Sequence, residues 1–206
     1  MFFVLMTVLA ALSITMEQWG YCGPTAAGMT GGSHNWYGVH FTPPADAYTA
    51  TISQIEMWCG ASPGYSNADV RLRIFKFIAT QPNPITETWS QNYNFDIPAT
   101  GPTGNWVTFN LVPAFVYNRS VSPEFLVAFQ SETAPSNPSQ YSMIGYDGEI
   151  STPNRNWIAL DKNMPLPSDW SLSTQGDYMF RLTFNYTPSG SPVEPTSLGN
   201  IKAVYH

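Results

Sequence analysis

Charged side chains are scarce in this chain, and their scarcity excludes a class of partner. Only 11% of the 206 residues are Asp, Glu, Lys or Arg, whereas soluble domains average about 25%. The 8 Lys and Arg residues stand against 14 Asp and Glu residues, which gives a net charge of −6 without any basic run. Because phosphate binding needs clustered cations, we expect no nucleic-acid partner.

Cysteine and histidine are also rare. Cys22 and Cys59 form no Cys-x-x-Cys motif, which leaves little support for a zinc or redox centre. In a secreted chain an even pair predicts one disulfide, here Cys22–Cys59, and the alternative is two unpaired thiols. The three histidines, His34, His40 and His206, match no familiar spacing of zinc ligands.

Catalytic motifs are absent as well. Gly60-Ala-Ser-Pro-Gly64 has the spacing of a hydrolase nucleophile elbow, in which the residue after the serine donates its N–H to the oxyanion hole. That residue is Pro63, which has no N–H. Acidic residues are scattered and mostly border turns, so no carboxylate pair for glycoside hydrolysis stands out. We therefore expect a protein that is not an enzyme and has no cofactor.

What the chain does contain is aromatic residues and turn formers. Aromatics make up 15% of it, with 18 Pro and 15 Gly, a composition that favours strands joined by turns. No long helical pattern follows residue 20. The expected strands are 39–42, 49–59, 69–79, 105–111, 124–130, 141–147, 156–161 and 178–186. The spacing predicts a single antiparallel β-sandwich, jelly-roll-like, over residues 20–186.

Two of these strands carry informative patterns. From Phe180 to Tyr186 the even-numbered residues are apolar and those between them are polar, as in a strand with one buried face. In 69–79 the alternation slips at Phe75-Lys76-Phe77, which predicts a β-bulge.

An uncharged apolar run opens the chain. Residues 1–16 are fewer than the roughly 20 that a membrane helix needs, so we expect no transmembrane span in the mature domain. Two interpretations stay open for segment 1–19: a secretory signal, or a retained assembly segment with contacts through Phe2, Phe3 and Leu5. Both interpretations predict an extracellular or cell-surface location.

A second segment follows the last strand. Residues 187–206 comprise a Pro/Gly/Ser-rich linker and an amphipathic tail, Ser197-Leu-Gly-Asn-Ile-Lys-Ala-Val-Tyr-His206. As a helix the tail would group Leu198, Ile201 and Tyr205, and as a strand Ile201, Ala203 and Tyr205. We expect it to dock through Leu198, Ile201, Val204 and Tyr205.

Several of these runs share a resemblance. Ser122-Pro-Glu-Phe-Leu-Val-Ala-Phe129, Ile144-Gly-Tyr-Asp147, Trp170 and Gly176-Asp-Tyr-Met-Phe-Arg-Leu182 resemble the second half of jelly-roll modules in large secreted bacterial proteins. The tail is similar to their Trp-Gly-x-Ile-Lys-x-x-Phe/Tyr-Arg motifs, with Leu198 in place of the Trp and His206 in place of the Arg. The resemblance covers about 120–206 and implies secretion and a β-sandwich, without an activity.

Aromatic residues near loops are the remaining candidates for ligand contact. Trp36, Tyr37 and Trp89 are expected to be exposed, where their rings could stack on a polysaccharide. The alternative is that they fill the core, as most large aromatics do. The sequons at Asn118 and Asn185 are compatible with glycosylation.

One turn offers a candidate for calcium. Asp147-Gly-Glu149 could supply oxygen ligands to a structural Ca²⁺, with Asp161 or Asp177 brought close by folding. The alternative is an ordinary exposed Asp-Gly turn.

With no catalytic site, the flanking segments become the expected functional parts. The sequence predicts a non-catalytic extracellular structural protein, a filament or surface-layer subunit that forms a homo-oligomer or polymer through its terminal segments. The alternative is a carbohydrate-binding or adhesion module that uses the loop aromatics.

Overall fold

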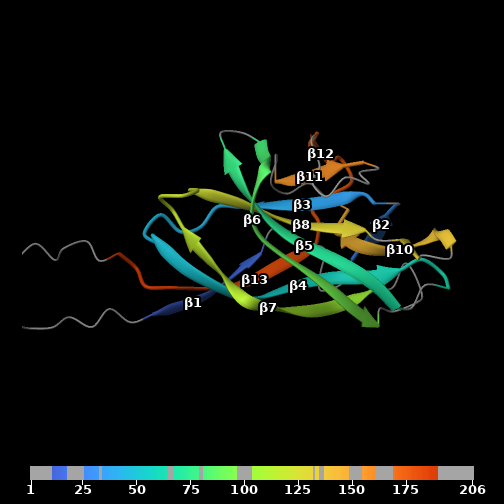
Figure 1. Cartoon of the computed structure of the whole chain (residues 1–206), viewed down its shortest axis with the longest axis horizontal. Helices are drawn as coiled ribbons and strands as arrows, with labels where there is room; N and C mark the ends of the chain where they lie inside the picture. The colour runs from blue at the N-terminus through green and yellow to red at the C-terminus, as the bar shows by residue number, and fades with distance from the viewer. Residues whose placement is uncertain are drawn as a thin grey trace, which may run out of the picture.

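Two antiparallel β-sheets pack face to face, and the part of the chain that the structure describes contains no helix (Figure 1). The computed structural model describes residues 11–17, 26–32, 34–64, 67–78, 81–96, 104–131, 133–134, 137–148, 155–160 and 169–189. The prediction of an all-β antiparallel sandwich is confirmed, whereas the jelly-roll order stays a prediction. Within the described ranges no helix is long and apolar enough to cross a membrane.

The two sheets bring together strands that are distant in sequence. In spatial order the first sheet consists of β1 (Leu12–Glu17), β13 (Phe180–Tyr186), β4 (Thr49–Ala61), β10 (Asn137–Tyr146) and β2 (Gly28–Gly31), with β7 (Asn105–Asn118) paired to β4 and β9 (Thr133–Ala134) to β10. The second consists of β12 (Ser171–Leu172), β11 (Asn156–Ala159), β3 (Trp36–Phe41), β8 (Glu124–Ser131), β5 (Asn67–Ile78) and β6 (Gln81–Asp96).

All eight predicted strands overlap observed ones, and the strands that were not predicted lie toward the sheet edges. Pro82 and Pro84 predict a break, but they lie in β6, the outer strand of the second sheet. An edge strand tolerates proline because one side of its backbone has no ladder bond to lose. Residues 12–17, expected to belong to the apolar N-terminal segment, form β1 and pair with β13. Part of that segment therefore belongs to the sandwich.

The irregularity predicted at Phe75-Lys76-Phe77 is present on one side of β5 only. Pairing of β5 with β8 is regular from Val70 to Phe77. The register shifts occur on the other side of β5, in its pairing with β6. Phe75 and Phe77 simply continue the alternation onto the outer face of the sheet, where a second apolar cluster lies.

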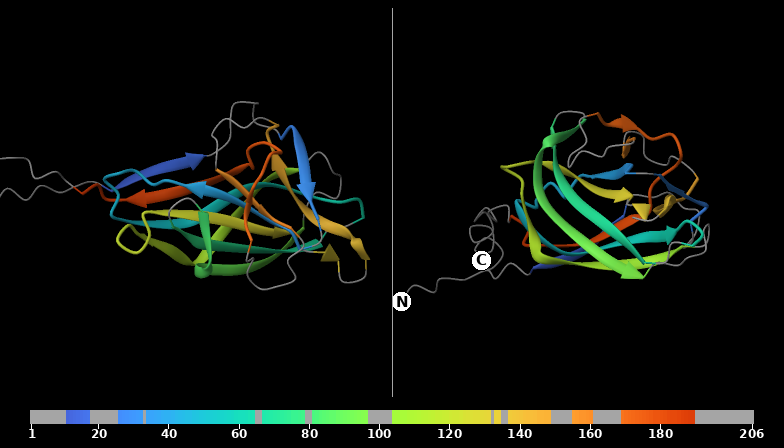
Figure 2. Two further views of the ribbon diagram at one scale, coloured as in Figure 1. Left: turned by 90° about the horizontal axis from the view of Figure 1, so that it is seen from above. Right: turned by 45° about the vertical axis from the view of Figure 1, so that its right-hand side comes forward.

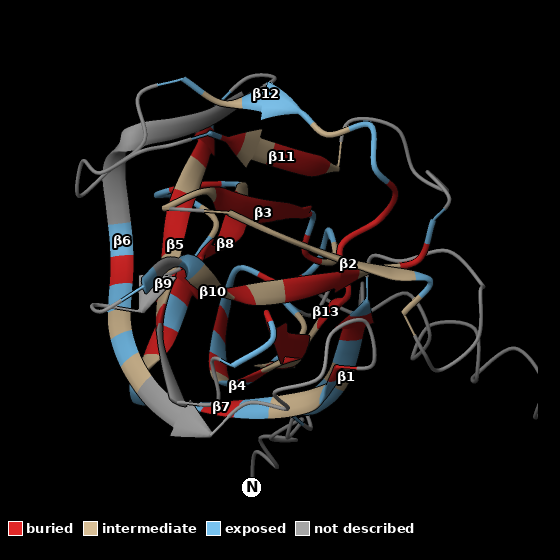
Figure 3. Ribbon diagram, turned by 90° about the vertical axis from the view of Figure 1, so that its right-hand side faces the viewer, coloured by how far each residue is buried: buried red, intermediate tan, exposed pale blue. Residues whose placement is uncertain are grey.

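The second sheet is thus buried on both faces. Between the sheets lies the main core, which contains Tyr37, Val39 and Phe41 of β3 and the apolar face of β13. On the outer face of the second sheet, Trp36 packs edge-to-face on Phe75, with 6.1 Å between ring centroids. Figure 3 shows the buried residues along β3, β5 and β10.

Side chains of β6 close one side of the sandwich by bonding to the backbone of β7. Three hydrogen bonds join Trp89 Nε1 to Pro113 O, Val112 N to Gln91 Oε1, and Tyr93 OH to Asn110 O, at 2.9, 3.0 and 2.8 Å. Burial raises the pKa of Tyr93 to about 12. The phenol is therefore protonated at neutral pH and donates its proton to the carbonyl.

Candidate functional site

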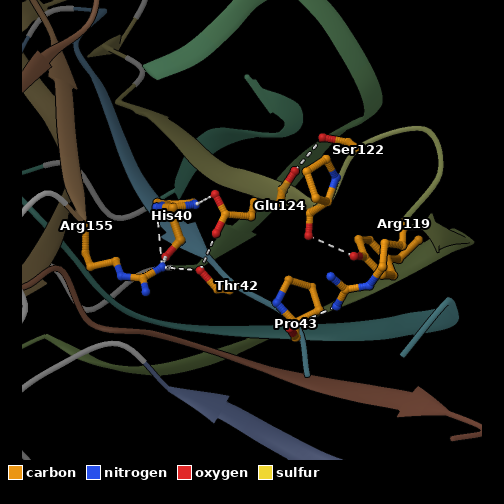
Figure 4. Close-up of polar contacts among 9 residues, drawn as sticks. His40, Thr42, Pro43, Arg119, Ser122, Glu124 and Arg155 are labelled. Atoms are coloured by element: carbon orange, nitrogen blue, oxygen red, sulfur yellow. Dashed lines mark hydrogen bonds and ion pairs between the residues drawn. The ribbon is translucent and has the colours of Figure 1, made fainter. Parts of the chain in front are cut away.

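Four polar side chains contact one another at the end of β3: His40, Thr42, Glu124 and Arg155, which we call the His40 cluster (Figure 4). Nε2 of His40 lies 3.0 Å from Oε2 of Glu124. Thr42 Oγ1 donates to Glu124 Oε1 at 2.8 Å and accepts from Arg155 Nη1 at 2.6 Å. The cluster links the end of β3 to the start of β8 and to the residue before β11.

The protonation of His40 follows from its neighbours. Burial and the nearby Arg155 lower its pKa, Glu124 opposes them, and the net result is a pKa of about 4. The ring is therefore neutral at pH 7. Arg155 Nη1 lies 3.3 Å from His40 Nδ1, and a guanidinium only donates, so Nδ1 accepts and the ring proton faces Glu124. The ring also stacks on Phe77, with 3.6 Å between centroids.

This arrangement does not match a catalytic triad. In a triad the histidine bonds to the nucleophile, and an acid orients the histidine from the other side. Here both ring nitrogens of His40 face charged groups, and the hydroxyl of Thr42 bonds to Glu124 instead of to the ring. His40 is only 8% exposed. The contacts are therefore better suited to holding three segments of the chain together than to catalysing a reaction.

A second polar group, around Arg119, orders the connection between β3 and β4. The Arg119 guanidinium donates to the carbonyl of Pro43 at 3.2 Å (Figure 4). It also donates to the carbonyl of Ala47 at 3.0 Å and to that of Pro44. Its backbone N–H donates to Tyr48 O at 2.9 Å. One side chain thus satisfies three carbonyls of a proline-rich loop that has few donors of its own.

The described residues next to both flanking segments lie at this same end of the sandwich. Leu12, the first residue of β1, pairs with Tyr186, the last residue of β13, and Figures 1 and 2 show the two strands side by side. Ser189 donates from its N–H and its hydroxyl to Asp46 O, at 2.9 and 3.0 Å. A shallow depression of about 270 Å³ includes Ala11, Tyr186 and Val116.

Val116 also lines a deeper, more apolar cleft. This cleft of about 280 Å³ lies between residues 114–118 of β7 and strands β5 and β6, and we call it the side cleft. Its aromatic lining consists of Phe75, Trp89, Phe115, Tyr117 and Phe125. Val116 and Val121, which also line it, are 67% and 54% exposed. Exposed apolar side chains therefore lie beside the point where both flanking segments leave.

The predicted exposure of the loop aromatics is wrong. Trp36 is 0%, Tyr37 1% and Trp89 9% exposed. Tyr37 and Trp89 belong to the main core and Trp36 to the outer cluster, and Trp89 also borders the side cleft. Their ring faces do not meet solvent, so they do not form a platform for sugars.

The predicted disulfide receives no support. Cys59 is a free cysteine, 1% exposed in the main core, and burial raises the pKa of its thiol. Cys22 lies outside the described residues, as do Phe2, Phe3, Leu5, Leu198, Ile201, Val204 and Tyr205. Contacts of the two flanking segments therefore stay predictions.

The two sequon asparagines differ in environment. Asn118 is exposed at the end of β7, where its Oδ1 accepts from the N–H and hydroxyl of Ser120 at 2.9 and 2.7 Å. Asn185 is half-buried within β13, between Ser13 of β1 and Thr51 of β4. Glycosylation at either residue stays a prediction.

Folding does bring Asp147 close to Asp177. The N–H of Asp177 donates to Asp147 Oδ1 at 3.0 Å, and Asn156 Nδ2 donates to Asp177 Oδ1. Gly148 has φ +82°, which a glycine adopts without strain. Both aspartates are buried, whereas Gly148 is exposed. Glu149 and Asp161 lie outside the described residues, and within them no group of three His, Cys, Asp or Glu could hold a metal. Calcium binding is untested.

Comparisons with known proteins add little. No protein family and no curated protein matches the chain. Two solved structures of infectious bursal disease virus show weak similarity. The chain from the Gx strain matches with a TM-score of 0.33 and 11% identity over 95% of this chain and 47% of its own length. The chain from the Gt strain matches with a TM-score of 0.25 and 9% identity, over 95% of this chain and 46% of its own length. The chain thus spans about half of either, and TM-scores this low do not establish a shared fold.

Proposed function

We propose that this chain is a non-catalytic structural protein that assembles with copies of itself, outside the cell or at its surface, through its flanking segments. The observation that carries the proposal is the shared exit point of the two segments. Segments 1–10 and 190–206 leave at paired residues of β1 and β13, beside exposed apolar side chains of β7.

Apolar segments next to exposed apolar surface favour contact between copies. A segment that leaves one copy and binds a different surface of the next makes a head-to-tail contact, which continues into a filament unless the rotation closes a ring. Low overall charge reduces the repulsion between such copies. These features support a polymer more than an isolated module.

A carbohydrate-binding function finds no support in the described residues. The aromatic residues expected to hold sugars are inside the fold, and the side cleft is just below the roughly 300–1,000 Å³ of typical ligand pockets. We therefore do not propose it as a second function.

The test compares the full chain with two deletions, one of residues 1–10 and one of residues 190–206. We expect the full chain to form particles larger than a monomer by light scattering and electron microscopy. Each deletion should raise the concentration needed for assembly or abolish it. Circular dichroism should show the same β-spectrum in all three, because β1 and β13 stay complete.

A control separates loss of assembly from loss of folding. The deletion that stops at residue 10 leaves Leu12–Glu17 paired with β13, and urea unfolding should give a similar midpoint for the sandwich. A full chain that stays monomeric at every concentration, or deletions that assemble like the full chain, would contradict the proposal.

A further inference from the structure

We propose that the side cleft receives residues 197–206 of a neighbouring copy, which add a strand to the free edge of β7. This inference rests on the proposed function and names the surface to which one flanking segment binds. The occupying segment lies outside the described residues. The receiving surface lies within them.

The first argument is the direction of the backbone groups of β7. Arg119 N–H donates to Tyr48 O at 2.9 Å, so this pair continues the hydrogen-bonded ladder between β7 and β4. Because bonding alternates along an antiparallel ladder, Val116 directs its N–H and C=O away from β4. Asn118 shares that phase, and its C=O accordingly accepts from the N–H of Val121 at 3.0 Å. None of the described residues is seen to bond the outward groups of Val116.

The second argument is where this edge is open. Among the side chains of β6 that the structure describes, those that bond to the backbone of β7 reach as far as Pro113. The turn that follows Asn118 closes the other end. The open stretch between them borders the side cleft. An unpaired edge beside an apolar cleft is the surface that accepts an added strand, with backbone bonds giving affinity and the cleft selecting side chains.

The third argument is the pattern of residues 197–206. A strand that extends the first sheet points alternate side chains toward the second sheet and toward solvent. Ile201, Ala203 and Tyr205 would then enter the side cleft. Val204 would lie on the outer face and cover Val116, which is 67% exposed. Cross-strand pairs of β-branched residues stabilise such a ladder.

Segment 1–10 fits this edge less well. Its apolar residues run without alternation from Phe2 to Met6, so an added strand would expose half of them. In contrast, Ile201, Ala203 and Tyr205 fall on one face of such a strand. The seven residues 190–196 span at most about 25 Å when extended, and they start at Ser189 on the end of the fold where copies would meet.

The test uses full chain with p-benzoylphenylalanine replacing Val116, mixed with ¹⁵N-labelled full chain and irradiated. We expect mass spectrometry to find cross-links between position 116 of one isotopic form and a peptide within 197–206 of the other. Cross-links to that peptide only within the same isotopic form would show that the segment folds back on its own chain, which overturns the inference. Cross-links to other regions would also overturn it.

Matched variants of the full chain test the geometry. Val116→Pro removes the outward N–H without touching a bond to β4, whereas Val116→Thr keeps it. We expect Val116→Pro to raise the concentration needed for assembly about tenfold or more, since an unmet backbone group costs a bond and its desolvation. Ile201→Asp should have a similar effect. Lys202→Asp, on the opposite face of the added strand, should have little. Equal behaviour of the two Val116 variants would overturn the inference.

The outcomes separate this inference from the proposed function. An assembling chain that tolerates Val116→Pro and shows no cross-link to 197–206 retains the function but loses this docking site. A chain that never assembles overturns the function itself.

Discussion

Acidification from pH 7 to pH 5 should weaken the fold through one buried side chain, His40. The pKa of His40 falls from 6.5 to about 4 on folding. Between these values the unfolded chain binds a proton that the folded chain does not. The contribution of His40 to the free energy of unfolding is therefore fully present above pH 6.5 and is lost as the pH falls toward 4.

The magnitude follows from the same shift. The whole shift corresponds to about 3 kcal/mol, and the share lost between pH 7 and pH 5 is about 2 kcal/mol. The side chain is only 8% exposed, so solvent screening removes little of this value. Glu124 and Arg155 are the charged groups that face the ring, and their opposing effects are already contained in the shift.

Urea unfolding followed by tryptophan fluorescence at several pH values between 5 and 7 measures this loss. The control is His40→Gln, which keeps a polar side chain that does not titrate. All other titratable groups are the same in both proteins, so the difference in slope isolates the histidine. Parallel curves for the two proteins would refute the reasoning, and so would a wild-type protein that gains stability on acidification.

Two further predictions concern side chains with assigned contacts. Trp36→Ala should destabilise the fold by about 3–5 kcal/mol, because it empties a fully buried site beside Phe75. A stable variant that had lost binding to a polysaccharide would instead favour a sugar-binding function. Arg119→Met keeps the aliphatic stem but leaves three loop carbonyls without their donor, so urea unfolding should show a loss of about 1–3 kcal/mol. An unchanged unfolding midpoint would show that these bonds do not stabilise the loop.

The sequence predicts the central strands because their alternation is a local property. In β13 each apolar residue from Phe180 to Tyr186 faces the core and each polar residue between them is more exposed, as the pattern predicts. Strand β6 begins with two prolines, which predict a break, and its place in the sheet comes from pairing with β5. Local residue preference does not report such pairing.

Candidate sites were harder to predict than strands. Trp36 and Tyr37 precede the predicted strand 39–42 and were expected to be exposed near a loop, whereas they are the first two residues of β3. Both are buried because the outer face of the second sheet carries its own apolar cluster. Phe75 and Phe77 carried the signal for that cluster. They interrupt the apolar alternation of strand 69–79 because they are buried on the outer face of the sheet, whereas the preceding apolar residues are buried on the inner face. The side cleft depends on where β6 stops bonding to β7, which no short motif encodes.

The pairing of Leu12 with Tyr186 determines how this molecule would respond to mechanical load. If neighbouring copies pull on the two flanking segments, the force enters at the outermost rung of the β1–β13 ladder. Bonds then break one after another, as in a zipper, and do not share the load as they would under shear. The other strands of the sandwich do not lie between the two points of pulling and carry little of the force. Such a subunit would yield at its first strand under low force, while the core that holds its shape stays intact.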